Sequence, residues 1–144
     1  MSRIPTPASI DDSPAGSREL LEGVRQQLGS VPNLFRIVGT SPAALEGYLG
    51  LNGALSKGSL PAATRERIAL AVAEINGCGY CLAAHTYLGS RFAKLSPEEI
   101  EANRRGESAD AKADAAVRFA VEIVRQRGQV DASAVERARR AGFT

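Results

Sequence analysis

Tryptophan is absent from the sequence, and only 5% of the residues are aromatic. The chain also lacks long hydrophobic runs. Its longest apolar stretch, Ile68 to Ala73, falls far short of the roughly 20 residues that a membrane helix needs. The first residues, MSRIPTPASIDDSP, have no apolar core of the kind that a signal peptide requires. These absences predict a cytoplasmic protein that neither spans nor binds a membrane.

A large excess of charge of one sign is missing too. The formal net charge is +2, which is too small to indicate a nucleic-acid partner by itself. A length of 144 residues with 44% hydrophobic residues predicts one folded domain with a proper core, not a disordered chain. Within this domain of residues 1–144, three prolines with polar neighbours predict that residues 1–14 form an extended arm.

Scarce aromatic residues and abundant alanine favour helices over strands. A capping residue followed by proline predicts a helix start in TSP at 40–42 and in SPEE at 96–99. Glycines such as Gly29 and Gly128 predict where helices end. Ser17 is expected to cap the first helix. No convincing β-hairpin pattern is present, so the predicted fold class is all-α. The expected helices cover residues 17–27, 32–38, 42–58, 61–76, 78–92, 96–108, 110–127 and a last segment from 131.

The two cysteines and the single histidine of the chain all lie in the segment EINGCGYCLAAH, residues 74–85. In a helix, Cys78, Cys81 and His85 fall within roughly 60° of one another around the axis. Asn76 and Gly77 predict that this helix starts near Cys78, where a short-loop disulfide can form and where the helix dipole favours a thiolate. His85 follows Cys81 by one turn and can take its proton directly or through one water.

Other interpretations of this trio stay open. A cysteine in a helix often only packs in the core, although the meeting of all three residues on one face weighs against that interpretation. Structural zinc needs four ligands, usually with a second pair of cysteines or histidines, and the chain has no such pair. We therefore expect a dithiol site with neither a bound metal nor a cofactor.

Glu66 lies ten residues before Asn76, and His85 lies nine residues after it. If the chain reverses at this point into two antiparallel helices, the two side chains reach similar heights, and Glu66 can hydrogen-bond His85 and hold its orientation. Two alternatives remain. Glu66 can instead pair on the surface with a neighbouring arginine, or Glu74, which is nearer to the cysteines, can contact the histidine.

Two stretches, VPNLFRIVGTSPAALEGYLGLNGAL and LPAATRERIALAVAEINGCGYCLAAHTYLG, resemble the alkylhydroperoxidase D (AhpD-like) family of the carboxymuconolactone decarboxylase superfamily. The family motif is a glutamate, eleven residues, and then Cys-x-x-Cys-x-x-x-His, which Glu66, Cys78, Cys81 and His85 match. The resemblance covers roughly Val31 to Leu95. It implies an all-helical fold, an AhpD-like bundle with the cysteine pair at the start of a helix, and homo-oligomers, commonly trimers or hexamers.

The resemblance also implies a thiol-dependent peroxidase that reduces hydroperoxides, organic ones among them. Glu66 and His85 then relay a proton, the Cys81 thiolate attacks the peroxide and becomes a sulfenic acid, and Cys78 condenses with it to a disulfide. An external dithiol, carried in relatives by a lipoyl-bearing protein, reduces the disulfide again. The helix start favours Cys78 as the acidic thiol, whereas the histidine base and the family favour Cys81 as the attacking one.

One residue departs from the family pattern. Tyr80 stands between the cysteines, where the best-known peroxidase relative has a histidine, and a tyrosine cannot act as a base near neutral pH. Two other functions remain as alternatives to a peroxidase. One is a carboxymuconolactone-type decarboxylase, whose chemistry needs no dithiol, and the other is a non-catalytic redox sensor that uses the disulfide as a switch.

Overall fold

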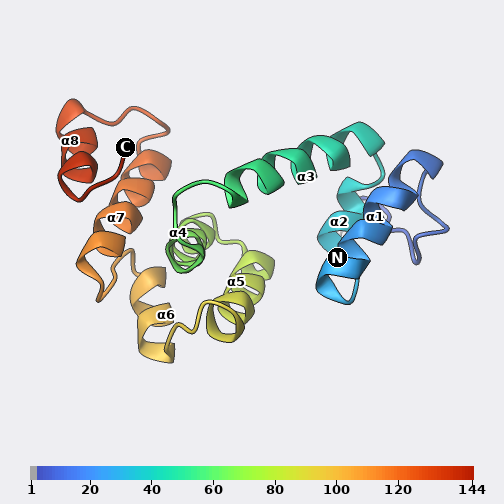
Figure 1. Ribbon diagram of the computed structural model, residues 1–144, viewed down its shortest axis with the longest axis horizontal. Coiled ribbons are helices and arrows are strands. Elements are labelled where there is room, and N and C mark those ends of the chain that lie inside the picture. The colour runs from blue at the N-terminus through green and yellow to red at the C-terminus, as the bar shows by residue number, and fades with distance from the viewer. Residues whose placement is uncertain (1–2) are drawn as a thin grey trace. The chain divides into compact units, whose positions relative to one another are not determined.

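The computed structural model describes residues 3–144, which contain eight α-helices and no β-strand (Figure 1). The all-α prediction is therefore confirmed for this part of the chain. None of the helices in it combines the length and the apolar character needed to cross a lipid bilayer. The helices are α1 (Ala15–Leu28), α2 (Asn33–Val38), α3 (Pro42–Ser56), α4 (Ala62–Ile75), α5 (Gly79–Arg91), α6 (Pro97–Arg104), α7 (Ala111–Arg125) and α8 (Ala132–Arg140).

The chain divides into two compact units, with the boundary between Gly58 and Ser59. The first unit contains α1 to α3. Its non-helical segment, residues 3–14, is tied to α2 because Arg36 donates hydrogen bonds to the carbonyl oxygens of Pro7 and Ala8, at 3.1 and 2.8 Å. Residues 1 and 2 of the predicted arm lie outside the described residues.

The prediction that Ser17 caps the first helix is wrong. Helix α1 begins two residues earlier, after Pro14, whose φ of −49° already suits a helix start. Ser17 is fully buried, and its hydroxyl donates to the carbonyl oxygen of Gly39 at 2.7 Å. A buried hydroxyl needs a partner, and this one finds it at the end of α2.

Four of the other helix starts, those of α3, α6, α7 and α8, have a capping serine or aspartate. At each of these starts the capping side chain accepts a hydrogen bond from the backbone N–H three residues later, which satisfies a donor that the helix itself leaves free. The capping residues are Ser41, Ser96, Asp110 and Asp131.

The second unit is built around α4, which packs against α5, α6 and α7. Leu70 forms a buried cluster with Leu95 and Ile100, while Ala71 forms another with Val117 and Val121. A helix with buried residues on more than one side has a fixed rotation about its axis. The polar side chains that α4 carries are therefore held in fixed directions.

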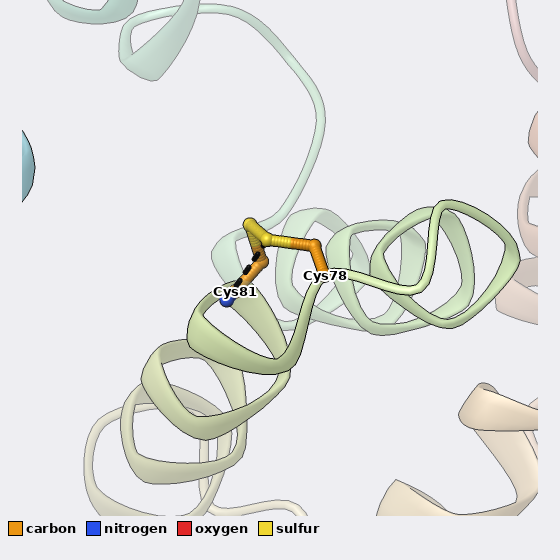
Figure 2. The surroundings of a disulfide bond; sticks show 2 residues. All are labelled: Cys78 and Cys81. Atoms are coloured by element: carbon orange, nitrogen blue, oxygen red, sulfur yellow. Dashed lines mark hydrogen bonds between the residues drawn. A yellow bond between two sulfur atoms is a disulfide. The ribbon is translucent and has the colours of Figure 1, made fainter. Parts of the chain in front are cut away.

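The chain reverses between α4 and α5 at Gly77. This residue has φ of 61°, a left-handed conformation that glycine adopts without steric cost. The N–H of Cys78 returns to the carbonyl oxygen of Ala73 at 3.0 Å and closes the turn. Cys78 is the N-cap residue of α5 (Figure 2), so the cysteine pair stands at the start of a helix as predicted.

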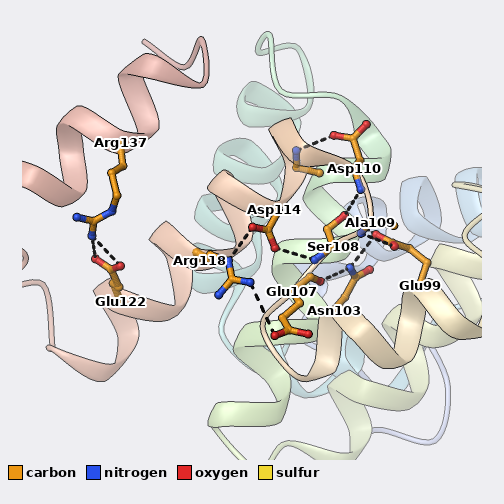
Figure 3. Close-up of polar contacts among 11 residues, drawn as sticks. Glu99, Asn103, Glu107, Ser108, Ala109, Asp110, Asp114, Arg118, Glu122 and Arg137 are labelled. Carbon is orange, nitrogen blue, oxygen red and sulfur yellow. Dashed lines mark hydrogen bonds and ion pairs between the residues drawn. The ribbon is translucent and has the colours of Figure 1, made fainter.

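A polar network joins α6 and the loop before α7 (Figure 3). Arg67 connects this network to α4. The centre of the network is Glu99, which accepts hydrogen bonds from Arg67 at 2.7 Å, Asn103 at 2.9 Å, the Ala109 N–H at 3.0 Å, and the Ser108 hydroxyl. Burial raises the pKa of Glu99, but these four donors outweigh burial and lower the pKa from 4.5 to about 2.

This network predicts a specific loss of stability in acid. Because the pKa of Glu99 is lower in the folded protein, its stabilising contribution is complete above pH 4.5 and is lost as the pH falls toward about 2. Glu99→Gln should lower the free energy of unfolding at neutral pH by about 1–3 kcal/mol. It should also flatten the fall in stability between these two pH values, as measured by urea unfolding at several pH values.

Glu101→Gln is the matched control, because Glu101 lies on the same helix and its side chain is 57% exposed. This variant should keep the wild-type stability at neutral pH and the wild-type acid dependence, since exposed ion pairs contribute little. Equal acid dependence in the Glu99→Gln variant and the wild type would contradict the role assigned to Glu99.

Candidate functional site

Cys78 and Cys81 are joined by a disulfide, with a Cα–Cα distance of 5.3 Å (Figure 2). Both residues are half-buried. The short-loop disulfide that the i, i+3 spacing allows is thus present, and the structure represents the oxidised form of the pair. A bond that closes such a small loop next to the protein surface can be opened by a thiol from outside.

The backbone N–H of Cys81 donates a hydrogen bond to the sulfur of Cys78 at 3.2 Å. Cys78 Sγ therefore occupies the position that a serine or aspartate oxygen usually takes at a helix start. In the reduced protein the same N–H and the positive end of the helix dipole would stabilise a negative charge on this sulfur. The geometry thus favours Cys78 as the sulfur that bears negative charge when the disulfide opens.

His85 and Glu66 form a pair between α5 and α4. His85 Nδ1 lies 2.8 Å from Glu66 Oε2, and both side chains are partly buried. An ionised carboxylate can only accept a hydrogen bond, so Nδ1 carries the proton and donates it. This tautomer leaves Nε2 of His85 with a free lone pair, which can take up a proton.

The structure decides between the carboxylates that the sequence left open. Glu74 pairs with Arg104, with Nε and Oε2 2.7 Å apart, and Arg67 pairs with Glu99. Glu66 is thus the acidic residue at the histidine, because the reversal at Gly77 brings α4 and α5 side by side. Two pairs result, the disulfide and Glu66–His85, and their catalytic roles remain predictions.

Helix α5 carries two exposed tyrosines. The side chains of Tyr80 and Tyr87 are 51% and 62% exposed, and the ring of Tyr87 meets Phe92 edge to face. Tyr80, between the two cysteines, is therefore exposed and does not pack in the core. Among residues 3–144, no group of three or more His, Cys, Asp or Glu side chains is placed to hold a metal ion.

Gly89 was missed by the sequence analysis. It is buried on α5, one turn after His85, and a Cβ atom built on it would lie 4.0 Å from Cβ of Glu66. A glycine four residues after a candidate catalytic histidine, inside an expected helix, is the sequence signal that could have drawn attention to it.

Comparison with known proteins gives one family and several solved structures. The model of the carboxymuconolactone decarboxylase family matches residues 42–126, a stretch that contains both pairs of the site. None of the curated proteins matches the chain significantly.

Two solved structures from bacteria are similar to this chain. One is an uncharacterized peroxidase-related protein from Silicibacter sp. TM1040, with 25% identity and a TM-score of 0.80 over 100% of this chain and 80% of its own. The other, from Ralstonia eutropha JMP134, is described as an alkylhydroperoxidase AhpD core and an uncharacterized peroxidase-related protein. It has 26% identity and a TM-score of 0.84 over 99% of this chain and 77% of its own.

Proposed function

The chain belongs to the carboxymuconolactone decarboxylase family and has the AhpD-like fold, and on this premise we propose that it is a thiol-dependent peroxidase. In this proposal it reduces hydroperoxides through the Cys78–Cys81 pair, with Glu66 and His85 as a proton relay. The observation that carries the proposal is the disulfide at the start of α5, one helical turn from a histidine that is held by a carboxylate. Both similar structures come from proteins described as peroxidase-related.

The proposed cycle starts from the reduced protein. His85 takes the proton of Cys81 at Nε2, directly or through one water, while Glu66 holds Nδ1–H and stabilises the imidazolium that forms. The Cys81 thiolate then attacks the hydroperoxide. A sulfur–oxygen bond forms, the oxygen–oxygen bond breaks, Cys81 becomes a sulfenic acid, and the departing alkoxide takes the proton of the Cys78 thiol to leave as an alcohol.

The second half of the cycle forms the disulfide. The Cys78 thiolate, stabilised by the N–H of Cys81, attacks the sulfenic sulfur of Cys81 and expels hydroxide. The hydroxide takes the proton that His85 has held and leaves as water, which restores the neutral imidazole. Every proton taken from the two thiols is thus accounted for in the alcohol and the water.

An external dithiol must then restore the two thiols. Its thiolate attacks one sulfur of the disulfide, the other sulfur leaves as a thiolate, and the second thiol of the reductant releases the protein from the mixed disulfide. The two protons that the reductant loses replace those on Cys78 and Cys81, so that Cys78 enters the next cycle as a thiol. The sulfur that is better stabilised as a thiolate leaves more readily. The hydrogen bond from the Cys81 N–H favours attack on Cys81 with Cys78 as the leaving group.

Steady-state turnover tests this function against its two alternatives. With dihydrolipoamide as the electron source, the protein should consume cumene hydroperoxide or hydrogen peroxide over many cycles. A single oxidation per chain, without further turnover, would instead identify a redox sensor. Turnover of a lactone acid without any thiol would identify a decarboxylase, a reaction in which the disulfide has no step to perform.

A further inference from the structure

Helix α3 is mostly apolar and mostly exposed. Its sequence, PAALEGYLGLNGALS, has one charged residue, Glu46, in 15 positions. Within the described part of the chain, Leu45 is the only residue of α3 that is buried. The side chains of Tyr48, Leu51 and Leu55 are 39%, 63% and 61% exposed. A helix that is apolar over most of its surface is normally covered by other protein.

Helices α1 and α2 support α3 near its start (Figure 1). A Cβ atom built on Gly16 of α1 would lie 3.2 Å from Cβ of Pro42, and on α2 the ring of Phe35 meets that of Tyr48 edge to face. Residues 50–56, in contrast, are all exposed. They include two glycines, which lower helix stability, and a helix of this length is marginal in water without packing. The second half of α3 therefore needs a partner.

Four exposed residues form an apolar line along one side of α3, which we call the α3 seam. They recur at intervals of four, three and four residues and are Ala44, Tyr48, Leu51 and Leu55. With 3.6 residues per turn, they fall within about 60° around the helix axis. These intervals are those of the two apolar positions in the heptad of a coiled coil, which keep facing a second helix along its length. The α3 seam thus has the pattern of a helix–helix contact.

The α3 seam is free of charge. Residues 45, 47, 52 and 54 flank it, and none of them is charged either. Glu46 falls on the opposite side of the helix, about 180° from the seam. Two copies of the seam can therefore face each other without repulsion between like charges. No charge on the seam selects a different partner.

The sizes of the seam side chains indicate the direction of pairing. In an antiparallel pair, Ala44 faces Leu55 of the partner subunit, and Tyr48 faces Leu51 of the partner subunit. Each layer then combines a smaller side chain with a larger one, which fills the space between the helices. A parallel pair would place alanine against alanine, which leaves a gap, and tyrosine against tyrosine. The antiparallel pair has a two-fold axis, so the same surface serves both copies.

We propose that this protein pairs with a second copy of itself through the α3 seam, with the two helices antiparallel about a two-fold axis. Pairing removes the exposed apolar surface of Tyr48, Leu51 and Leu55 from water. It requires a dimer or a larger assembly with an even number of subunits. The proposal does not depend on the peroxidase function, because the seam contains no residue of the disulfide or of the Glu66–His85 pair.

Sedimentation velocity of the full chain over a range of concentrations measures the number of subunits. The wild-type protein should have an even number. Leu51→Lys should halve it, from dimer to monomer or from hexamer to trimer, because Leu51 lies next to the two-fold axis and the pair would bury two lysines close together. Glu46→Lys is the matched control, since it puts a lysine on the opposite side of the same helix, and it should keep the wild-type number.

Oxidative cross-linking tests the direction, in chains that carry Cys78→Ser and Cys81→Ser. A mixture of Ala44→Cys and Leu55→Cys chains should form a disulfide between the two variants. Ala44→Cys alone should not cross-link, because an antiparallel pair separates its two copies by roughly 16 Å along the axis. A cross-link in Ala44→Cys alone would contradict the antiparallel pair.

Circular dichroism first shows which variants fold, and Leu55→Lys replaces Leu51→Lys if the latter does not. A wild-type trimer would overturn the proposal, because an odd number of subunits leaves one seam unpaired. A wild-type monomer would also overturn it and would indicate that the second unit of the same chain covers the seam. The same holds for a folded Leu51→Lys variant with the wild-type number of subunits, or for an equal effect of Glu46→Lys.

Discussion

Replacing Cys81 with serine is expected to reduce hydroperoxide consumption to the rate of the uncatalysed reaction between the dithiol and the peroxide. The serine hydroxyl does not ionise readily, so His85 at the next turn has no acidic thiol to deprotonate. The variant also lacks the sulfur that would become the sulfenic acid, and it cannot form the disulfide. The loss of hydroperoxide over time, with dihydrolipoamide in excess, measures the effect.

Cys78→Ser provides the matched comparison, because it removes the other half of the same disulfide and its hydroxyl can still cap α5. This variant should react with one equivalent of hydroperoxide and then stop, since no second thiol is present to resolve the sulfenic acid. Dimedone should label Cys81 in this variant, as detected by mass spectrometry. Undiminished turnover in Cys81→Ser, or a label on neither sulfur, would contradict the proposed mechanism.

Replacing His85 with alanine should lower kcat/KM by about 10²-fold or more, the usual contribution of a general base. The size of this loss in kcat/KM should depend on pH. Without the imidazole, Cys81 must lose its proton to solvent, which becomes easier as the hydroxide concentration rises. The ratio of the wild-type kcat/KM to that of His85→Ala should therefore be largest at low pH and should fall as the pH increases. Initial rates over a range of pH measure both effects.

Two further variants serve as comparisons for the loss in His85→Ala. Glu66→Gln changes the partner of the histidine, and Tyr87→Ala is the control. The glutamine keeps the shape and an acceptor oxygen for His85 Nδ1 but removes the negative charge, so its effect should be smaller than that of His85→Ala. Tyr87 lies two residues after His85 with its side chain 62% exposed, and its removal should leave the pH dependence unchanged. A His85→Ala variant with the wild-type rate and pH profile would exclude the base role.

The sequence was sufficient wherever local interactions decide the structure. Alanine content, proline at helix starts and capping side chains such as Ser96 and Asp131 act within a few residues, and the helices that they predict are present. The disulfide could be anticipated for the same reason, because Cys78 and Cys81 are separated by less than one helical turn. Ser17 shows the limit, since a residue of the capping type lies inside α1 and binds a carbonyl 22 residues away.

The sequence by itself determined an all-helical chain with a cysteine pair at a helix start and a histidine one turn beyond, because helical periodicity fixes which residues share a face. Only the tertiary structure decided that Glu66, and not Glu74, meets His85. That choice depends on how closely α4 and α5 approach. The approach is set by the reversal at Gly77 and by the packing of α4 against α5, and the periodicity of a single helix does not determine either of them.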